Sequence, residues 1–325
     1  MRETWNPAAA ARGLREAGFG EVQEALPLSR LTAGRVGGPA DVVLTVRTVE
    51  ALAVAAGWLW QREYPFRILG GGSNVLAADA GYRGVIVLNT CRAMRQEEGA
   101  AGPRLWAESG ANFGMLARRS AEQGLSGLEW AVSIPGTVGG AVVGNAGAYG
   151  GDVAGSLEVA EILHPSEGRS RWDSARLAYG YRSSWLKSHP GEAVVLGAGF
   201  RCQLTSSEAV KARMAEFVAQ RQRTQPPGAS WGSTFKNPPG DSAGRLLDEA
   251  GLKGLRRGDA QISPAHANFI LNLGDARAAD VRQLVEEARQ RVKAQSGIEL
   301  ELEVELIGTW EPGGPGSIAT GEAAV

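Results

Sequence analysis

The chain has 325 residues, of which 43% are hydrophobic and 21% are charged. At roughly 150 residues per domain, this length predicts about two domains, and the composition is that of a folded globular protein rather than a disordered one. Lysine and arginine together number 34, against 35 aspartates and glutamates, so the net charge is -1. A protein with so little net charge has no overall field that would attract nucleic acid or an anionic membrane, and we expect neither partner.

The cysteine and histidine content indicates a reducing, cytoplasmic location without a metal site. The two cysteines, Cys91 and Cys202, cannot form a disulfide framework, and the three histidines lie in no spacing typical of zinc. The longest apolar run near the N-terminus, residues 8–11, is too short for a signal-peptide core or a membrane span. We expect residues 1–20 to be an N-terminal extension.

The first half of the chain mixes strands and helices, which predicts an α+β fold. Strands are expected at 41–46, 66–69 and 85–89, and helices at 50–61 and 112–123. A glycine-rich stretch follows at 134–150. Its small and apolar residues favour a buried loop that lines a ligand, with a flexible solvent-exposed loop as the weaker alternative.

The pattern changes after Cys202, where a new domain is expected. Thr205 and Glu208 match a capping box, and apolar residues recur at helical spacing behind them. A second amphipathic helix is predicted to end near Gly297. Residues 298–306 alternate between apolar side chains and glutamates, which predicts one half-buried strand. Residues 309–325 are expected to be a disordered tail.

Glycine is the unusual component, with 45 residues, roughly twice the average usage. One cluster, Gly70, Gly71 and Gly72, is followed by Ser73 and Asn74 directly after a predicted strand. Backbone amides of such a segment can surround an anion, although a plain tight turn remains an alternative. The spacing matches neither the dinucleotide-binding fingerprint nor the P-loop.

Two arginines and a serine are candidates for ligand binding or catalysis. Arg182, between tyrosines and small hydroxyl residues, can bind a carboxylate through two parallel hydrogen bonds, or it can simply be exposed. Arg221 continues the apolar face of its helix and either brings charge to a ligand or extends into solvent. Ser233 has no triad partners, so it is either a proton donor beside positive charge or a structural turn residue.

Four glutamates on one face of the final strand usually face solvent. One of them becomes a candidate for hydrogen-bonding a substrate oxygen if it lies in a cleft with an arginine.

Six motifs in order resemble the UDP-N-acetylenolpyruvoylglucosamine reductase family. They are GGGSNVL, IPGTVGGAVVGNAGAYG, YGYRSSWLK, GSTFKNP, AHANFILN and GIELELEVELIG. The resemblance extends from about residue 31 to residue 308. It implies an FAD-binding module of the vanillyl-alcohol-oxidase type at 21–204, in two subdomains split near 91, and a smaller α+β substrate-binding domain at 205–308.

The resemblance also implies a reaction. NADPH first reduces non-covalently bound FAD, and a UDP-linked enolpyruvyl amino sugar is then reduced, in peptidoglycan precursor synthesis and hence in cell wall biogenesis, cell shape and division. Arg182 and Glu303 match the family residues that stabilise the enolate, and Ser233 matches the proton donor. A monomer is expected.

The remaining implied site residues fall into two sets. The cofactor set is Gly70, Gly71, Gly72, Ser73, Asn74, Pro135, Gly136, Val138, Gly139, Gly140, Asn145 and Arg221. The substrate set is Tyr149, Tyr181, Asn237 and His266.

The chain departs from the family pattern at three places. Glu305 stands where the family often has an arginine, and Gly144 replaces a larger residue. The short span between Arg182 and Thr205 indicates the subclass without a tyrosine-bearing insertion. A flavin-dependent alcohol oxidase of the same fold and a non-catalytic sugar-nucleotide-binding protein remain alternatives.

Overall fold

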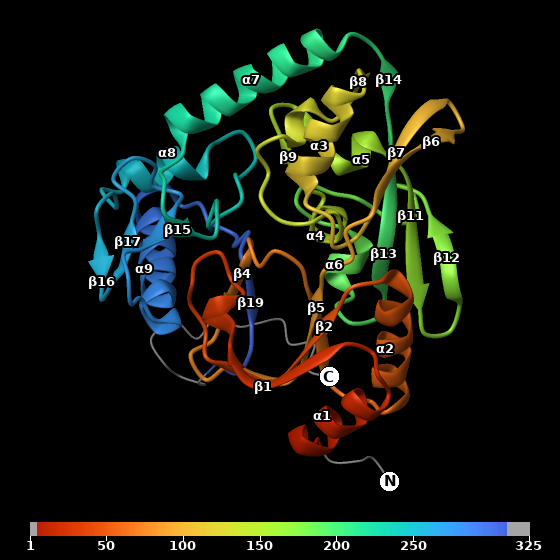
Figure 1. Cartoon of the computed structure of the whole chain (residues 1–325). Helices are drawn as coiled ribbons and strands as arrows, with labels where there is room; N and C mark the ends of the chain where they lie inside the picture. The colour runs from red at the N-terminus through yellow and green to blue at the C-terminus, as the bar shows by residue number, and fades with distance from the viewer. Residues whose placement is uncertain (1–4, 311–325) are drawn as a thin grey trace. The chain divides into compact units, whose positions relative to one another are not determined.

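The structure is a computed structural model that describes residues 5–310 (Figure 1). The described chain forms two compact units. Unit 1 comprises residues up to 24, then 42–71 and 84–223, and unit 2 comprises residues 25–41, 72–83 and those from 224 onward. Unit 2 therefore takes two segments from the first half of the chain. The expected domain boundaries at 21, 91, 205 and 308 stay predictions.

Unit 1 contains most of the helices and strands of the described chain. Its helices are α1 (Pro7–Glu16), α2 (Val49–Gln61), α3 (Phe113–Glu122), α4 (Val138–Gly144), α5 (Val153–Ser156), α6 (Trp185–Ser188) and α7 (Ser207–Thr224), with a 3-10 turn at Glu129–Ala131. Its strands, some extending across the unit boundary, are β1 (Glu21–Pro27), β2 (Pro39–Val46), β3 (Phe66–Leu69), β5 (Tyr82–Asn89), β6 (Met94–Gly99), β7 (Gly102–Glu108), β8 (Leu125–Ser126), β9 (Gly147–Ala148), β10 (Gly151–Asp152), β11 (Leu157–His164), β12 (Gly168–Trp172), β13 (Val194–Arg201) and β14 (Gln203–Leu204).

Two sheets organise these elements. A four-stranded sheet has the order β1-β2-β5-β3, with β3 and β5 parallel, and a five-stranded antiparallel sheet has the order β12-β11-β13-β7-β6 (Figure 1). Each is associated with its own hydrophobic core. One core contains α1 and α2, and the other contains α3, α4 and part of α7. The expected strands at 41–46, 66–69 and 85–89 are confirmed within these sheets.

Side-chain caps begin the helices near the predicted positions. Thr48 accepts a hydrogen bond from the Ala51 amide before α2, and Asn112 accepts one from the Met115 amide before α3. Such caps satisfy amides that have no partner within the helix. The predicted helices at 50–61 and 112–123 are therefore confirmed to within a residue or two.

Two local predictions in this unit were wrong. The stretch 134–150 is not loop throughout, because residues 138–144 form α4 with Val138, Ala141 and Val142 buried on one face. The cap of α7 is Ser206, whose hydroxyl accepts from the Ala209 amide, and not Thr205. The Thr205 amide instead donates to the Gly124 carbonyl, which holds Thr205 outside the helix.

Unit 2 contains a small antiparallel sheet packed against one long helix. The sheet has the order β15-β18-β17-β16, formed by β15 (Ala229–Ser230), β18 (Ile270–Asn272), β17 (Ala260–Ile262) and β16 (Arg256–Arg257). The other elements are the 3-10 turn Leu28–Arg30, β4 (Val75–Ala77), α8 (Ala243–Glu249), α9 (Ala278–Ser296) and β19 (Glu305–Ile307). The blue helix α9 lies against β16 and β17 (Figure 1).

Helix α9 has a defined beginning and end. The carboxylate of Asp79 accepts hydrogen bonds from the Ala278 and Ala279 amides at 2.8 and 2.9 Å. A negative charge at a helix N-terminus is stabilising. Gly297 ends the helix with a φ of 73°, which confirms the predicted stop.

The expected single strand over 298–306 was wrong in its extent, because only Glu305–Ile307 form a strand, β19. Residues 301 and 303 exchange backbone hydrogen bonds with Lys236 and Thr234, and the chain then moves to β4, with which β19 pairs in parallel. This change of partner interrupts the strand. The burial alternation survives in part, since Leu300 and Val304 are buried and Glu299 and Glu301 are exposed.

The beginning of the expected tail is ordered. The Thr309 amide donates to the Gly81 carbonyl at 2.9 Å, and Trp310 packs on the core of unit 2 with the Arg282 guanidinium over its ring. The expectation of a disordered tail was therefore wrong for these two residues, and residues 311–325 lie outside the described part. Among residues 5–310, no helix combines the length and apolar character that crossing a bilayer requires.

Candidate active site

The two glycine-rich segments of unit 1 lie in close contact at Gly70 and Gly71. A side chain at Gly70 would lie 2.2 Å from the Thr137 hydroxyl, and one at Gly71 would lie 3.0 Å from the Gly136 Cα. Only glycine permits this approach. The structure thus brings together Gly70, Gly71 and Gly136, which the sequence assigned to one cofactor.

Helix α4 has one face packed in the core and another without side chains. Val138 is fully buried, and the Gly139 amide donates to the Ser109 carbonyl at 2.8 Å. Gly140 and Gly144 lie four residues apart and share a face. A Cβ at Gly144 would meet nothing within 4 Å, and one at Gly140 would meet only the Thr137 hydroxyl at 3.7 Å. This bare surface fits a flat ring system lying against backbone. Pro135, which precedes it, is exposed.

Asn145 ends α4 in the left-handed conformation, with a φ of 44°. Its side chain is buried, donates to the Gly180 carbonyl at 2.8 Å and accepts from the Ala154 amide at 3.0 Å. Both Nδ2 and Oδ1 of the Asn145 side chain are thus hydrogen-bonded within the protein. The expectation that Asn145 contacts a cofactor stays a prediction.

Arg182 lies in a tight turn beside this segment. Its Nη2 donates to the Gly147 carbonyl at 2.7 Å, and its guanidinium lies 5.1 Å from the centre of the Tyr181 ring. Tyr181 itself is 54% exposed. Arg182 is partly buried, so the alternative of a fully exposed arginine was wrong.

Tyr149 lies against α7, the helix that carries Arg221. The Tyr149 ring stacks on Phe217, with centres 4.5 Å apart and planes at 10°. Burial lowers the pKa of the Arg221 guanidinium. A half-buried cation beside an aromatic ring can bind an anionic group of a ligand. Arg221 is therefore more enclosed than a side chain that only extends into solvent.

In unit 2 the backbone brings Ser233 and Glu303 together. The Glu303 amide donates to the carbonyl of Thr234, the residue after Ser233, at 2.9 Å. The side chain of Asn74 donates to the Glu303 carbonyl at 3.0 Å, and the Asn74 carbonyl accepts from the Glu305 amide at 2.9 Å. Both Ser233 and Glu303 are half-buried. The two predicted catalytic residues of this unit thus lie on neighbouring segments that Asn74 helps to hold.

The glycine loop that precedes Asn74 is shaped by packing. A Cβ at Gly72 would lie 2.1 Å from the Leu31 carbonyl, and Gly72 has a φ of 59°. Packing alone therefore explains glycine at this position. Ser73 is half-buried in the same loop.

The sequence reasoning missed Asn268, which holds the segment carrying Ser233. Its side chain accepts from the Phe235 amide at 2.9 Å and donates to the Phe235 carbonyl at 2.8 Å, in the manner of a strand partner. Its main-chain carbonyl accepts from the Thr234 amide at 2.8 Å. The residue lies inside the AHANFILN motif, so the available signal was a polar residue among apolar ones.

Asn237 and His266 both lie against the first turn of α8. Asn237 accepts from the Ala243 amide at 3.0 Å, and a Cβ at Gly244 would lie 2.9 Å from the His266 ring. Burial lowers the pKa of His266, and the nearby positive charge of Lys253 adds to the shift. The Asn268 amide donates to His266 Nδ1, which places the proton of the neutral ring on Nε2.

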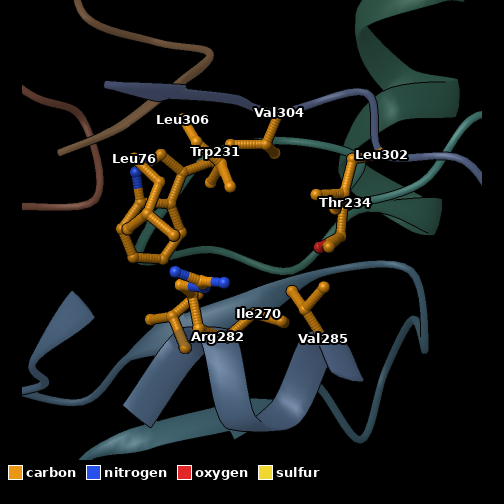
Figure 2. A pocket seen from close by; sticks show the side chains of 10 residues that line it. Leu76, Trp231, Thr234, Ile270, Arg282, Val285, Leu302, Val304 and Leu306 are labelled. Atoms are coloured by element: carbon orange, nitrogen blue, oxygen red, sulfur yellow. The ribbon is translucent and has the colours of Figure 1, made fainter. Parts of the chain in front are cut away.

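A small apolar cavity lies in unit 2 beside the segments that carry Ser233 and Glu303 (Figure 2). Its lining is Leu76, Trp231, Thr234, Ile270, Val281, Arg282, Val285, Leu302, Val304 and Leu306. None of the predicted site residues lines it. The cavity therefore belongs to the packing between α9 and the final strand.

Comparisons with known proteins define the class first. A model described as an FAD binding domain matches residues 40–162. Together with the bare face of α4 and the paired glycine segments of unit 1, this match makes the chain an FAD-dependent oxidoreductase of α+β fold. The fold class and the cofactor expected from the sequence are thereby confirmed.

The family is identified by a model that matches the C-terminal part of the chain and by relatives that align with most of its length. A model described as the C-terminal domain of UDP-N-acetylenolpyruvoylglucosamine reductase matches residues 222–307. A reductase of that name from Chloroflexus aggregans is 45% identical over 284 residues, 86% of this chain and 96% of the relative. Another from Rubrobacter xylanophilus is 44% identical, covering 87% of this chain and 94% of the relative.

A solved structure agrees with these relatives. The crystal structure of the reductase from Thermus caldophilus is 40% identical and superposes with a TM-score of 0.76. It covers 88% of this chain, which covers 99% of that one. The chain belongs to the UDP-N-acetylenolpyruvoylglucosamine reductase family, so the resemblance drawn from the six motifs is confirmed. The roles of the individual site residues stay predictions.

Proposed function

We propose that the chain reduces the enolpyruvyl double bond of UDP-N-acetylglucosamine enolpyruvate to give UDP-N-acetylmuramate, with NADPH as co-substrate. The observation that carries this proposal is the 45% identity to a reductase over 96% of that relative's length. The six motifs occur in the same chain, and four of them provide Asn74, Arg182, Ser233 and Glu303.

The chemistry divides between the cofactor and the chain. FAD, when bound, accepts hydride from NADPH and supplies it to the terminal carbon of the double bond. Gly140 leaves room for the cofactor against the backbone of α4, and the other proposed cofactor residues are Gly70, Gly71, Gly72, Ser73, Asn74, Pro135, Gly136, Val138, Gly139 and Arg221. Tyr149, Tyr181, Asn237 and His266 are proposed to bind the sugar nucleotide.

Arg182 and Glu303 act on the substrate carboxylate. Adding hydride to the terminal carbon moves negative charge onto that carboxylate as an enolate. A guanidinium is a rigid planar set of N–H donors, which suits a carboxylate, and this one is held in place by its bond to the Gly147 carbonyl. Glu303 hydrogen-bonds the same group. Preorganised groups of this kind typically contribute about 10²–10³ in rate.

Ser233 completes the reduction. Its hydroxyl donates a proton to the carbon next to the carboxylate, and the serine regains a proton from solvent. The balance is one hydride and one proton added to the double bond, while NADPH becomes NADP+. General acid catalysis of this kind contributes about 10²–10⁴ in rate.

We also propose the cellular process that this reaction serves and the location and oligomeric state of the enzyme. The product is a precursor of peptidoglycan, which connects the enzyme to cell wall biogenesis, cell shape and cell division. We propose a monomer in the cytoplasm, with no nucleic acid and no membrane as partner.

The direct test is to incubate the purified flavoprotein with NADPH and the enolpyruvyl sugar nucleotide. The proposal expects NADPH consumption that requires the sugar nucleotide, and a product that carries two additional hydrogens by mass spectrometry. Oxidation of alcohols with oxygen as acceptor and no use of NADPH would instead identify an oxidase. Binding of the sugar nucleotide without turnover would identify a non-catalytic binding protein.

A further inference from the structure

We propose that Asn145 is a positioning residue for Arg182: its side-chain amide holds the turn that carries this arginine and so sets the binding of the substrate carboxylate. The inference rests on the proposed function, because it takes Arg182 as the group that binds the carboxylate. It gives the Asn145 side chain a role other than cofactor contact.

The turn that carries Arg182 needs restraint from outside. It extends from Gly180 to Ser183, and the Ser183 amide donates to the Gly180 carbonyl at 3.2 Å. Arg182 has a φ of 53°. Residues with long side chains occupy this left-handed region only where their surroundings hold them there.

Asn145 supplies that restraint at the carbonyl that closes the turn. Its Nδ2 donates to Gly180 O at 2.8 Å, a shorter contact than the turn's own 3.2 Å. A carbonyl oxygen has two lone pairs and can accept both bonds. The Asn145 Oδ1 accepts from the Ala154 amide, which fixes the orientation of the side chain. Because the residue is 4% exposed, water does not compete for these contacts.

Two more hydrogen bonds join the same two segments on either side of Asn145. The Ser184 hydroxyl donates to the Val143 carbonyl at 2.6 Å, and Arg182 Nη2 donates to the Gly147 carbonyl at 2.7 Å. The chain from 143 to 147 thus carries a row of three contacts to the arginine turn, with Asn145 in the centre. One strip of backbone, residues 143–147, therefore restrains the turn and orients the Arg182 guanidinium.

Close packing makes the strip intolerant of displacement. A Cβ at Gly147 would lie 3.3 Å from Arg182 Nη1 and 2.8 Å from the Gly151 carbonyl. The Lys187 ammonium donates to the Arg182 carbonyl at 3.1 Å from the other side. A shift of the Gly180 carbonyl therefore moves the arginine, and a misplacement of about 1 Å at a reacting group costs on the order of 10² in rate.

The test uses two replacements that remove the contact in different ways. Asn145→Asp keeps an acceptor for the Ala154 amide but places a carboxylate oxygen against the Gly180 carbonyl. Asn145→Gly removes both contacts and tolerates the φ of 44° without strain. Thr48→Ala is the control, because it removes a helix cap from the other hydrophobic core of unit 1.

Five quantities are measured on each holoenzyme. They are the FAD content with its visible spectrum, the rate of flavin reduction by NADPH, the rate of flavin reoxidation by the enolpyruvyl substrate, and the affinities for UDP-N-acetylmuramate and UDP. The product carries the carboxylate and UDP does not. A purely structural role changes both affinities together, whereas a role through Arg182 changes only the first.

Both Asn145 variants are expected to retain FAD with an unchanged spectrum and to be reduced by NADPH within about twofold of the parent rate. Reoxidation by the substrate should fall about 10- to 100-fold, because the carboxylate is misaligned. Affinity for UDP-N-acetylmuramate should fall about tenfold while affinity for UDP stays unchanged. Thr48→Ala should match the parent in all five quantities.

Loss of FAD from both variants would overturn the inference and identify Asn145 as a cofactor ligand. Equal losses of affinity for the two ligands would show a purely structural role, and variants that match the parent would show no role. If the parent itself transfers no hydride to the enolpyruvyl substrate, the proposed function is wrong and this inference falls with it. A functional parent with unaffected variants refutes the inference alone.

Discussion

Replacing Asn268 by alanine tests how the segment that carries Ser233 is held. The Asn268 side chain makes two hydrogen bonds to the backbone of Phe235, and the two residues are 3% and 2% exposed. Asn268→Ala removes both bonds and leaves the amide and the carbonyl of Phe235 without these partners in a region closed to water. A buried polar group that loses its partner costs about 1–3 kcal/mol, so two such groups cost about 2–6 kcal/mol of unfolding free energy.

Asn237→Ala is the matched control in the same unit. Asn237 is exposed and makes one bond, to the Ala243 amide at the start of α8, so its loss should cost only about 0.5–2 kcal/mol. Urea denaturation followed by circular dichroism measures both losses, and hydrogen exchange of the Thr234 and Phe235 amides locates the effect. A loss below about 1 kcal/mol for Asn268→Ala, or one equal to the control, would refute this reasoning.

Three further predictions concern single side chains. Ser233→Ala should leave flavin reduction by NADPH intact and slow reoxidation by the enolpyruvyl substrate about 10²–10⁴-fold; stopped-flow traces in which reduction is the slow step would contradict the assignment. Tyr179→Phe should keep or raise the melting temperature, because the buried Tyr179 hydroxyl has no hydrogen-bond partner among the described residues; a clear fall would reveal a partner. Burial holds the pKa of His266 below its ordinary value of 6.5, so the unfolded chain binds more protons than the folded chain. The free energy of unfolding should therefore fall as the pH drops from about 6.5 through the folded pKa. The denaturation midpoint of His266→Asn should depend less steeply on pH over that window.

The sequence predicted the strands β2, β3 and β5 and the long helices because their signals are local. Alternation predicted the burial of the last segment only in part: Leu300 and Val304 are buried, whereas Leu302 is half-buried like Glu303. Hydrogen-bond pairing is not local, so the change of partner from Thr234 to β4 could not be predicted from the same pattern. Helix α4 was missed because its glycines have low helix propensity, although Val138, Ala141 and Val142 have helical spacing.

The sequence named candidate residues for the site but not the contacts that hold them in place. Arg182, Ser233 and Glu303 came from motif resemblance, and the structure brings the latter two onto neighbouring segments of unit 2. The supporting role of Asn74 could not be predicted, because its side chain bonds a backbone carbonyl 229 residues away. An asparagine amide serves a ligand and a distant backbone group equally well, and the sequence does not distinguish the two.

An anaerobic titration of the purified flavoprotein tests the central claim most directly. NADPH is added until the flavin absorbance is bleached, and the enolpyruvyl sugar nucleotide is then added in the absence of oxygen. We predict that the absorbance returns in proportion to the sugar nucleotide and that UDP-N-acetylmuramate forms in equal amount. A flavin that NADPH does not bleach, or one that stays bleached after the sugar nucleotide is added, would contradict the account.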